Sequence, residues 1–481
     1  MRLCDLLPEC ELRDEVTGLS DDSAHVRGGN LFFALAGARR HGLDFSPQAR
    51  DNGAVAVVYD PKEGSPPEGL AIPCIGVEGL ATKVAGIAAR FYGHPSRKLE
   101  VIGITGTNGK TSCSFFLAQI LDGAVSGTLG WGRWPRLEST VHTTAPAIET
   151  QRRLHALALR GIETVAMEVS SHALAQGRVN AVDFDLALWT NLSRDHLDYH
   201  GSMEAYAASK RKLLLWPGLK AVVVNLDDPR WEWFAQGVRA PLFGFGWRHD
   251  GRVTFPHLAA GDIRFLPDRI EFQVRLGKAR ERVRLPLLGE CNLANALAVM
   301  TVLVARGADL AAAAAAVSTL RPVPGRMERF QRPGCPLVVV DYAHTPAALE
   351  AALRSLRRHV NGRLWLVFGC GGDRDRGKRP QMGQVAEKLA DRIIVTDDNP
   401  RGEDPAAIAG DIVAGMGHAP EVIHDRALAV ETAIGSANAN DIVLVAGKGH
   451  EAYQEAAGER SALCDRDLVA ALLGREAAPC V

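Results

Sequence analysis

The sequence predicts an α/β protein built from three domains, and three observations lead to that expectation. Its 481 residues amount to about three domains at roughly 150 residues each. Apolar runs of strand length alternate with helical segments along most of the chain, which is typical of parallel sheets with right-handed crossovers. One such run, at 101–105, passes through a glycine-rich turn into a helical segment.

The composition is that of an ordinary globular protein, with 47% hydrophobic residues and a formal net charge of −1. This charge gives no global field that favours nucleic acid or membrane. The nine scattered cysteines form no C-x-x-C pair, which argues against a disulfide framework or a zinc ribbon. Because we find neither a signal peptide nor an apolar run near the ~20 residues of a membrane span, we expect a cytoplasmic protein without membrane insertion or a nucleic-acid partner.

The first domain is expected over residues 1–95. Its short apolar runs at 31–35 and 54–59 are separated by glycine- and proline-rich turns such as 60–69. These features indicate a small α/β module.

The second domain is expected over residues 96–321. A helix is predicted over 147–161, and a tighter apolar–polar alternation within 251–286 indicates an antiparallel appendage. A further helix is predicted over 292–307, ending at Gly307. The predicted parallel strands are 101–105, 164–169, 186–190 and 221–225.

The third domain is expected over residues 322–481, as a second doubly wound sheet. In such sheets ligands gather at the carboxyl ends of the strands. The predicted strands are 336–341, 363–369, 391–397 and 441–447, and the polar clusters that end them are DYAHTP, GCGGDRDRGKRP, DDNPRGED and GKGHE. We therefore predict a binding site formed by these four clusters.

The glycine-rich turn has the form of a P-loop between a strand and a helix. Its residues are Gly106, Thr107, Asn108, Gly109, Lys110 and Thr111. Backbone N–H groups of such a loop and the helix N-terminus bind phosphate. The lysine reaches the β- and γ-phosphates, and the threonine can hold Mg²⁺. The strand-to-helix context favours ATP binding over a fortuitous turn.

Other polar residues extend this site. Glu168 ends a predicted strand beside the P-loop strand, where a carboxylate can bind the Mg²⁺ of a nucleotide or simply cap the strand. His196 is either a metal or phosphate ligand or a structural histidine. Lys210 has neighbouring lysines, and from spacing alone we expect it to be solvated.

The polar clusters of the third domain suggest a pocket for a zwitterionic amino acid. Arginine pairs with carboxylates through charge-assisted hydrogen bonds and stabilises a transferring phosphoryl group, and Glu451 suits an ammonium group. For any single residue, a surface salt bridge is an equally plausible role. The residues concerned are Arg326, Asp341, His344, Arg374, Asp398, Asn399, Arg401 and Glu451.

A set of motifs along the whole chain resembles the Mur ligase family of peptidoglycan synthesis. In order, they are GTNGKTS, MEVSSHAL, TNLSRDHLDYHG, NLANAL, PGRME, DYAHTP, GCGGDRDRGKRP, DDNPR and GKGHE. The resemblance implies a UDP-binding N-terminal domain, a central ATPase-like domain and a C-terminal Rossmann-like domain. It further implies an ADP-forming ligase, which phosphorylates the D-glutamyl γ-carboxyl of UDP-N-acetylmuramoyl-L-alanyl-D-glutamate. The amine of meso-diaminopimelate then attacks the acyl-phosphate.

The resemblance also implies roles for individual residues. Residues 106–111 are expected to hold ATP, with nucleotide contacts from Asn295, Arg326 and Asp341 and with His344 nearby. Two Mg²⁺ ions are expected, one held by Thr111 and Glu168 and the other by His196 and Lys210, which the family carbamylates. The residues expected to act in catalysis are Lys110, Lys210, His196, Arg326 and His344.

Two substrate sites follow from the same resemblance. The positions that match the UDP-muramoyl dipeptide site are Ser23, Arg39, Arg40, Thr143, Thr144, Ser170, Gln176 and Arg178. The positions that match the diaminopimelate site are Arg374, Asp398, Asn399, Pro400, Arg401, Gly447 and Glu451. The tetrad DNPR marks the acceptor, because relatives that add lysine lack its arginine, as expected if Arg401 pairs with a second carboxylate.

The first domain departs from the family pattern, since Ala24, Gly28 and Asn30 replace the usual arginine, proline and aspartate, and His142 stands where an asparagine-like residue is usual. Three alternatives stay open: a lysine-adding Mur ligase, a folylpolyglutamate synthetase, and a nucleotide-dependent switch protein. We expect a monomer whose partners are small-molecule substrates.

Overall fold

The structure is a computed structural model that describes residues 1–8, 10–37, 40–249 and 253–474. The chain divides into two compact units. The first unit comprises Met1–Lys110, Leu121–Val222 and Arg230–Leu242, and the second comprises Thr111–Ile120, Val223–Pro229 and Phe243–Val481. The three-domain limits expected from the sequence do not coincide with these units and stay a prediction.

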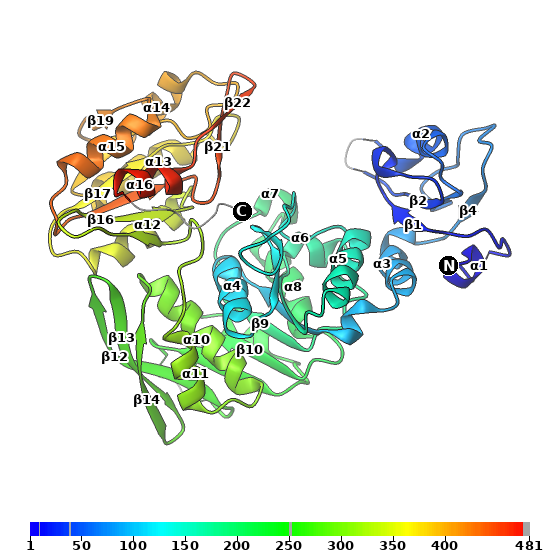
Figure 1. Ribbon diagram of the computed structural model, residues 1–481, viewed down its shortest axis with the longest axis horizontal. Helices are drawn as coiled ribbons and strands as arrows, with labels where there is room; N and C mark the ends of the chain where they lie inside the picture. The colour runs from blue at the N-terminus through cyan, green and yellow to red at the C-terminus, as the bar shows by residue number, and fades with distance from the viewer. Residues whose placement is uncertain (9, 38–39, 250–252, 475–481) are drawn as a thin grey trace. The chain divides into compact units, whose positions relative to one another are not determined.

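The N-terminal part of the first unit is a four-stranded parallel sheet in the order β1-β2-β3-β4 (Figure 1). The strands are β1 (Gly18–Ser20), β2 (Asn30–Ala34), β3 (Ala56–Tyr59) and β4 (Cys74–Gly76). The helices are α1 (Leu3–Leu6), η1 (Ser23–His25), η2 (Gly42–Phe45), α2 (Ser46–Asp51) and α3 (Leu80–Phe91). Leu31 and Phe33 pack in one apolar cluster and Phe32 in another, because successive side chains of a strand point to opposite faces.

The remainder of the first unit is built around the P-loop strand. Strands β9, β5, β8 and β6 are parallel, and β7 is antiparallel to β6. They span β5 (Glu100–Thr105), β6 (Ala124–Gly127), β7 (Gly130–Gly132), β8 (Thr164–Glu168) and β9 (Leu186–Trp189). The helices are η3 (Pro95–Lys98), α5 (Ala147–Leu159), α6 (Ser171–Ala175), α7 (Leu197–His200), α8 (Met203–Leu214) and α9 (Trp231–Ala235). The strands and the helix predicted here are confirmed to within one or two residues.

The second unit begins at Thr111, within α4 (Lys110–Ile120), and contains the predicted antiparallel appendage. Strands β12, β13 and β14 form two successive antiparallel pairs, and β11 pairs with β12 in parallel. The division between the units runs through β10 and β11. The elements are β10 (Ala221–Asn225), β11 (Leu242–Gly246), β12 (His257–Leu266), β13 (Arg269–Leu276), β14 (Ala279–Leu285), α10 (Glu290–Ala305) and α11 (Leu310–Val317).

The C-terminal part of the second unit is a doubly wound sheet in the order β15-β16-β20-β17-β18-β19. All strands are parallel except β15. They are β15 (Glu328–Phe330), β16 (Leu337–Asp341), β17 (Leu364–Phe368), β18 (Arg392–Val395), β19 (Glu421–Val422) and β20 (Ile442–Ala446), with a separate hairpin of β21 (Tyr453–Ala456) and β22 (Glu459–Ala462). The predicted second parallel sheet is therefore confirmed.

Helices cover both faces of this sheet (Figure 1). One apolar cluster joins Val339 to α12, α13 and α14, and another joins Val340 to α15 and α16. The helices are α12 (Pro346–Arg357), α13 (Lys378–Leu389), α14 (Pro405–Val413), α15 (Arg426–Ser436) and α16 (Asp465–Leu472). Because both faces are buried, the strands are apolar at nearly every position, as parallel strands usually are.

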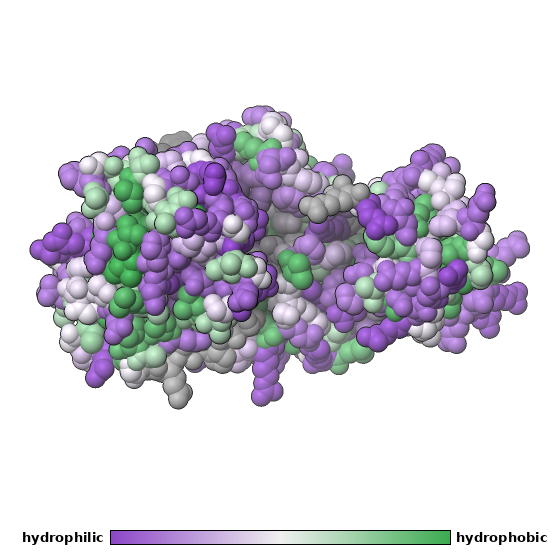
Figure 2. Space-filling view, turned by 90° about the horizontal axis from the view of Figure 1, so that it is seen from above, coloured by the Kyte–Doolittle hydropathy of each residue, from purple (hydrophilic) through white to green (hydrophobic). Residues whose placement is uncertain are grey.

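The surface seen in Figure 2 is mainly hydrophilic, and the cysteines of the described residues are free thiols. Figure 2 shows apolar residues in limited groups among more numerous hydrophilic ones. Within the described residues, no helix is both long and apolar enough to cross a bilayer. Eight of the cysteines lie in the described part of the chain, and all eight are free thiols.

Candidate functional site

The P-loop of the first unit connects β5 to the start of α4. Gly106 and Gly109 have φ values of +147° and +86°, a region that side chains rarely adopt. A Cβ on Gly106 would lie 1.9 Å from the hydroxyl oxygen of Thr190. The loop is held by the segment after β9, since the Thr107 N–H donates to the Asn191 carbonyl (2.9 Å) and the Thr190 hydroxyl donates to the Asn108 carbonyl (2.6 Å). The glycines are therefore required by the shape of the loop.

Two lysines converge on one carbonyl oxygen of this loop. Lys110 Nζ donates to the Gly106 carbonyl at 2.9 Å, and Lys210 Nζ donates to the same oxygen at 2.7 Å. Lys210 is 1% exposed, so the expectation from spacing alone that it is solvated was wrong. Burial, and then the charge of Lys110, lower the pKa of Lys210 well below its usual value. Both effects favour the neutral amine form of Lys210.

Glu168 is completely buried at the end of β8. Its Oε1 accepts from the Thr128 N–H at 2.9 Å, and its Oε2 lies 3.1 Å from the Thr128 hydroxyl. That hydroxyl also lies 3.1 Å from the hydroxyl of Thr143. The carboxylate predicted to bind metal is therefore linked, through the Thr128 hydroxyl, to a residue of the predicted dipeptide site.

Four more residues of the predicted dipeptide site form one hydrogen-bonded chain. The Thr144 hydroxyl donates to the Glu168 carbonyl (2.8 Å) and accepts from the Ser170 N–H (3.0 Å). Arg178 donates to the Thr144 carbonyl (2.9 Å) and to Gln176 Oε1 (2.8 Å). Residues that are far apart in the sequence thus surround the end of β8.

His196 lies in the loop before α7 with φ +51°. Its Nε2 is 3.4 Å from Asp195, and its ring centroid is 4.9 Å from that of His172. Tyr206, which the sequence did not single out, links this loop to the P-loop. Its hydroxyl is 3.1 Å from the Thr107 hydroxyl, and its ring centroid is 4.6 Å from Lys210 Nζ. No group of three or more His, Cys, Asp or Glu side chains in the described part of the chain is arranged to hold a metal.

Ser23 and Arg40, which belong to the predicted UDP-muramoyl dipeptide site, lie in the N-terminal sheet module. Ser23 is buried in η1, and its hydroxyl donates to Gln48 at 2.7 Å. Arg40 is exposed and lies 3.4 Å from Asp44, with its guanidinium over the ring of Phe45. Arg39 falls outside the described residues, so no structural statement is made about it.

In the second unit, the residues predicted to contact nucleotide lie on α4, on α10, at the end of β16 and in two loops. Thr111 is in the first turn of α4 and Asn295 is on α10, and both are buried. Arg326 places its guanidinium 4.3 Å from the ring centroid of Tyr342, a cation–π arrangement. His344 packs against the same Tyr342 ring, with ring centroids 4.6 Å apart.

Asp341 ends β16 and fixes the turn that carries Arg326. Its Oδ2 accepts from the Met327 N–H at 2.7 Å. Burial raises the pKa of Asp341, and the neighbouring charge of Arg326 opposes that shift. A Cβ on Gly325 would lie 2.2 Å from the backbone nitrogen of His450. The turn at 324–327 therefore packs directly on the GKGHE loop.

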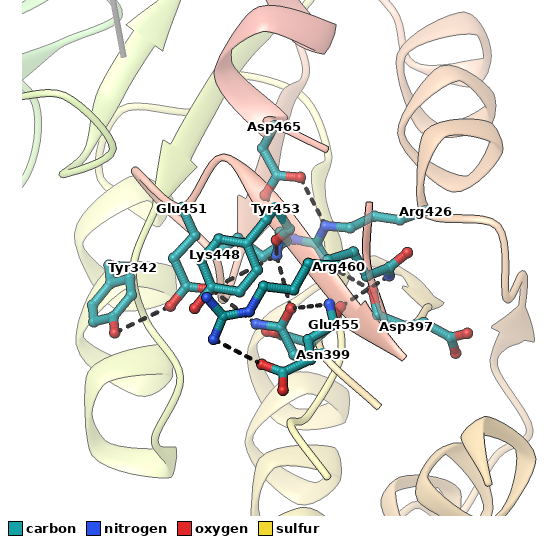
Figure 3. A network of polar contacts seen from close by, with 12 residues as sticks. Tyr342, Asp397, Asn399, Arg426, Lys448, Glu451, Tyr453, Glu455, Arg460 and Asp465 are labelled. Carbon is teal, nitrogen blue, oxygen red and sulfur yellow. Dashed lines mark hydrogen bonds and ion pairs between the residues drawn. The ribbon is translucent and has the colours of Figure 1, made fainter. Parts of the chain in front are cut away.

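The four polar clusters of the doubly wound sheet do converge. Asn399 Nδ2 donates to Glu451 Oε2 at 2.8 Å (Figure 3). Arg401 Nη1 donates to the Gly372 carbonyl at 2.9 Å. A Cβ on Gly447 would lie 2.4 Å from Asp398 Oδ2. Pro400 is buried beside Asn399, whereas Arg374 is exposed in the loop after β17.

Sequence reasoning missed Lys448, although it lies inside the GKGHE motif. Its side chain is completely buried. Its Nζ donates to Asn399 Oδ1 (3.3 Å) and to the Tyr453 carbonyl and lies 3.6 Å from Glu451 Oε2 (Figure 3). Because Asn399 Oδ1 also accepts from the Glu455 N–H (3.0 Å), its Nδ2 must face Glu451. Lys448 therefore sets the orientation of the amide.

Comparisons with known proteins match the whole length of the chain. Residues 104–303 match the family model of the Mur ligase middle domain, residues 325–449 match the Mur ligase glutamate ligase domain, and residues 15–92 match the model described as Mur ligase family, catalytic domain.

Individual relatives share a printed name. The UDP-N-acetylmuramoyl-L-alanyl-D-glutamate--2,6-diaminopimelate ligase of Xanthomonas campestris pv. campestris (strain 8004) is 48% identical over 495 residues, covering 99% of this chain and 98% of the relative. The ligase of the same name from Alkalilimnicola ehrlichii is 45% identical over 499 residues, covering 99% of each. A solved structure of that name has a TM-score of 0.72 at 35% identity, covering 98% of this chain and 99% of that chain.

Proposed function

The chain belongs to the Mur ligase family and is a ligase, and we propose that it joins meso-diaminopimelate to the D-glutamyl γ-carboxyl of UDP-N-acetylmuramoyl-L-alanyl-D-glutamate, with ATP as the energy source. The observation that carries the proposal is that Asn399 bonds to Glu451 and that both Asn399 and Arg401 contact Glu455. This arrangement offers an amide, a guanidinium and a carboxylate to a zwitterionic acceptor. The names of the relatives agree with this acceptor.

The proposed reaction has two steps. The γ-carboxylate attacks the γ-phosphorus of ATP, so that a C–O–P bond forms and ADP leaves. The neutral amine of the acceptor then attacks the acyl carbon, the tetrahedral intermediate expels inorganic phosphate, and the amine proton is lost to base. A carboxylate is a poor electrophile, and phosphorylation turns one of its oxygens into a leaving group. The protein's contribution is mainly positioning and charge stabilisation.

The P-loop supports the proposed binding of ATP phosphates by residues 106–111. Lys110 already lies over the loop, with Nζ 2.9 Å from the Gly106 and Thr107 carbonyls. We propose that Mg²⁺ is held by Thr111 and Glu168 and that a second ion is held by His196 and a carbamylated Lys210. Bound Mg²⁺ would neutralise phosphate charge. In the second unit, we propose that Asn295, Arg326, Asp341 and His344 contact the nucleotide.

The surroundings of Lys210 suit the proposed carbamate. Carbamylation requires a neutral amine, whose nitrogen bonds to the carbon of CO₂ and loses a proton. The lowered pKa and the burial of Lys210 favour that neutral form. The product is an anion, which can pair with Lys110 and offer oxygen ligands to Mg²⁺.

The acceptor pocket supports diaminopimelate over a monocarboxylic amino acid. Glu451 can bind an ammonium group, while Arg401 can bind the second carboxylate through its planar guanidinium. Arg374, Asp398, Pro400 and Gly447 complete the proposed pocket. For the UDP-muramoyl dipeptide we propose the chain of Thr143, Thr144, Ser170, Gln176 and Arg178, together with Ser23, Arg39 and Arg40. We also propose that the protein is a cytoplasmic monomer.

The test is a phosphate-release assay with the full chain, ATP and Mg²⁺. We expect release only when both the UDP-muramoyl dipeptide and diaminopimelate are present, with a tripeptide product of matching mass. Slow release that neither substrate changes would identify a nucleotide switch instead. Equal kcat/KM for lysine and diaminopimelate would contradict the proposed acceptor.

A further inference from the structure

The hairpin β21–β22 docks on the turn that carries Arg401. The Arg401 N–H donates to the Glu455 carbonyl (2.8 Å), and the Ala457 N–H donates to the Arg401 carbonyl (2.6 Å). These bonds form an isolated parallel bridge between Arg401 and Ala456. Arg401 has φ +54°, a conformation that costs free energy for a residue other than glycine. The hairpin therefore holds Arg401 in its backbone conformation.

The same hairpin places a carboxylate between two guanidinium groups. Glu455 Oε2 lies 4.0 Å from Arg401 Nε and 3.5 Å from Arg460 Nη2. Glu455 and Arg460 are directly opposite each other in the register of β21 and β22, where cross-strand pairs interact best. Arg460 also lies over the ring of Tyr453, 4.6 Å from its centroid, and Figure 3 shows it reaching toward Glu455.

The two ion pairs of Glu455 differ in length, so that Glu455 can give up Arg401 and remain paired with Arg460. The contact with Arg401 is long, whereas the contact with Arg460 is shorter and comes from the same hairpin. An acceptor carboxylate that approaches Arg401 can therefore displace Glu455 without leaving it unpaired. Arg401 is 21% exposed and Glu455 is 25% exposed, so an acceptor can reach both side chains.

Resting on the proposed function, we propose that Glu455 is a specificity-determining residue. Its carboxylate is a counter-ion of Arg401 and competes for it with the second carboxylate of the acceptor. Arg460 limits this competition, because it also pairs with Glu455. Diaminopimelate must replace Glu455 as the partner of Arg401, and this exchange weakens the binding of diaminopimelate. Lysine brings no second carboxylate, and Arg401 then keeps Glu455. With lysine in the site, the cost of leaving the Arg401 guanidinium without a carboxylate partner is thereby reduced.

Removing the negative charge of Glu455 is expected to tighten the binding of diaminopimelate. Glu455→Gln keeps the size of the side chain and the backbone bonds to Arg401 and Asn399. We expect the KM for diaminopimelate to fall about two- to five-fold, the range of a partly exposed ion pair. The kcat and the KM values for ATP and the muramoyl dipeptide should not change. The KM for lysine should stay the same or rise, so selectivity for diaminopimelate increases.

A second variant has the opposite expected effect. Arg460→Gln leaves Glu455 with Arg401 alone, so the KM for diaminopimelate should rise by about two- to five-fold. The double variant should behave like Glu455→Gln, because Arg460 acts only through Glu455. Glu459→Gln, at an exposed position of β22, is the matched control for a loss of one negative charge in the hairpin and should change neither KM.

The proposal is overturned if Glu455→Gln leaves the KM for diaminopimelate unchanged or raises it, or if Glu459→Gln lowers it equally. Additive effects of the two single changes would also overturn the role given to Arg460. Failure of the proposed function is distinct, since the unaltered chain would then form no product with either amino acid.

Discussion

A buried ion pair next to residues of the proposed acceptor site gives a prediction about stability. Arg426 and Asp465 are both fully buried. The guanidinium donates from Nε and Nη2 to the two carboxylate oxygens at 2.7 and 2.8 Å. It also donates to the carbonyls of Ala446 (3.0 Å) and Asp397 (3.2 Å) (Figure 3). The pair thus joins α15 and α16 to the ends of two strands that carry pocket residues.

Replacing Asp465 by Asn removes the charge and almost none of the volume. The guanidinium of Arg426 then loses its buried, hydrogen-bonded counter-ion, and breaking one partner of a buried pair costs about 3–5 kcal/mol. Each kcal/mol lowers Tm by about 2–4 °C in a domain of roughly 150–250 residues. We therefore expect the thermal transition of the C-terminal part to fall by roughly 6–20 °C in calorimetry of the full chain.

Two controls show whether burial is the cause. The pair Glu350–Arg354 is exposed on α12, and Glu350→Gln should cost at most about 0.5 kcal/mol. Replacing both Arg426 and Asp465 by Met and Leu should recover much of the lost stability, because an apolar pair needs no desolvated charge. A decrease in Tm for Asp465→Asn no larger than that for Glu350→Gln would refute the reasoning.

Three further predictions concern the site and its support. Lys210→Ala should abolish activity, and short carboxylates should partly restore it by replacing the proposed carbamate; unchanged Mg²⁺ occupancy without rescue would contradict that role. Arg401→Lys should raise the KM for diaminopimelate about ten-fold, since the bidentate geometry is lost, and an unchanged KM would contradict the pairing. Hydrogen bonds from Arg379 and Arg376 lower the pKa of Glu403 from 4.5 to about 2. The stability gained from this carboxylate is therefore present above pH 4.5 and is lost as the pH falls toward 2, so the difference in Tm between Glu403→Gln and the unaltered chain should vanish over that interval.

The fold could be predicted where the residue pattern within one strand or helix determines the structure of that element. Val338 to Val340 and Val443 to Val445 belong to strands that are buried on both faces, and such strands are recognisable as continuous apolar runs. Gly307 follows the C-cap residue of α10 and has φ +98°, as a glycine just after a helix often does. The division into compact units was not predictable, because it depends on contacts between segments distant in the sequence.

The chemistry of the site was only partly predictable, for a related reason. The P-loop lies within six residues, so its glycines and lysine identify it directly. The burial of Lys210 depends on β5 and α8 packing together, and the contact of Glu455 with Arg401 depends on a hairpin folding back over 50 residues later in the chain. Lys448 was recognisable as part of a motif, yet its role in orienting Asn399 follows only from three-dimensional contacts.

The carbonyl oxygen of Gly106 accepts hydrogen bonds from two lysine side chains, Lys110 and Lys210. Two amines within hydrogen-bonding distance of one oxygen cannot both be charged without repulsion, and Lys210, the more buried of the two, yields its proton more easily. A group that is neutral for this reason is poorly suited to binding phosphate by itself but well suited to attack CO₂. Once carbamylated, it would turn repulsion from Lys110 into attraction. These contacts support the proposed roles of Lys110 as a phosphate-binding cation and of Lys210 as the precursor of an anionic metal ligand.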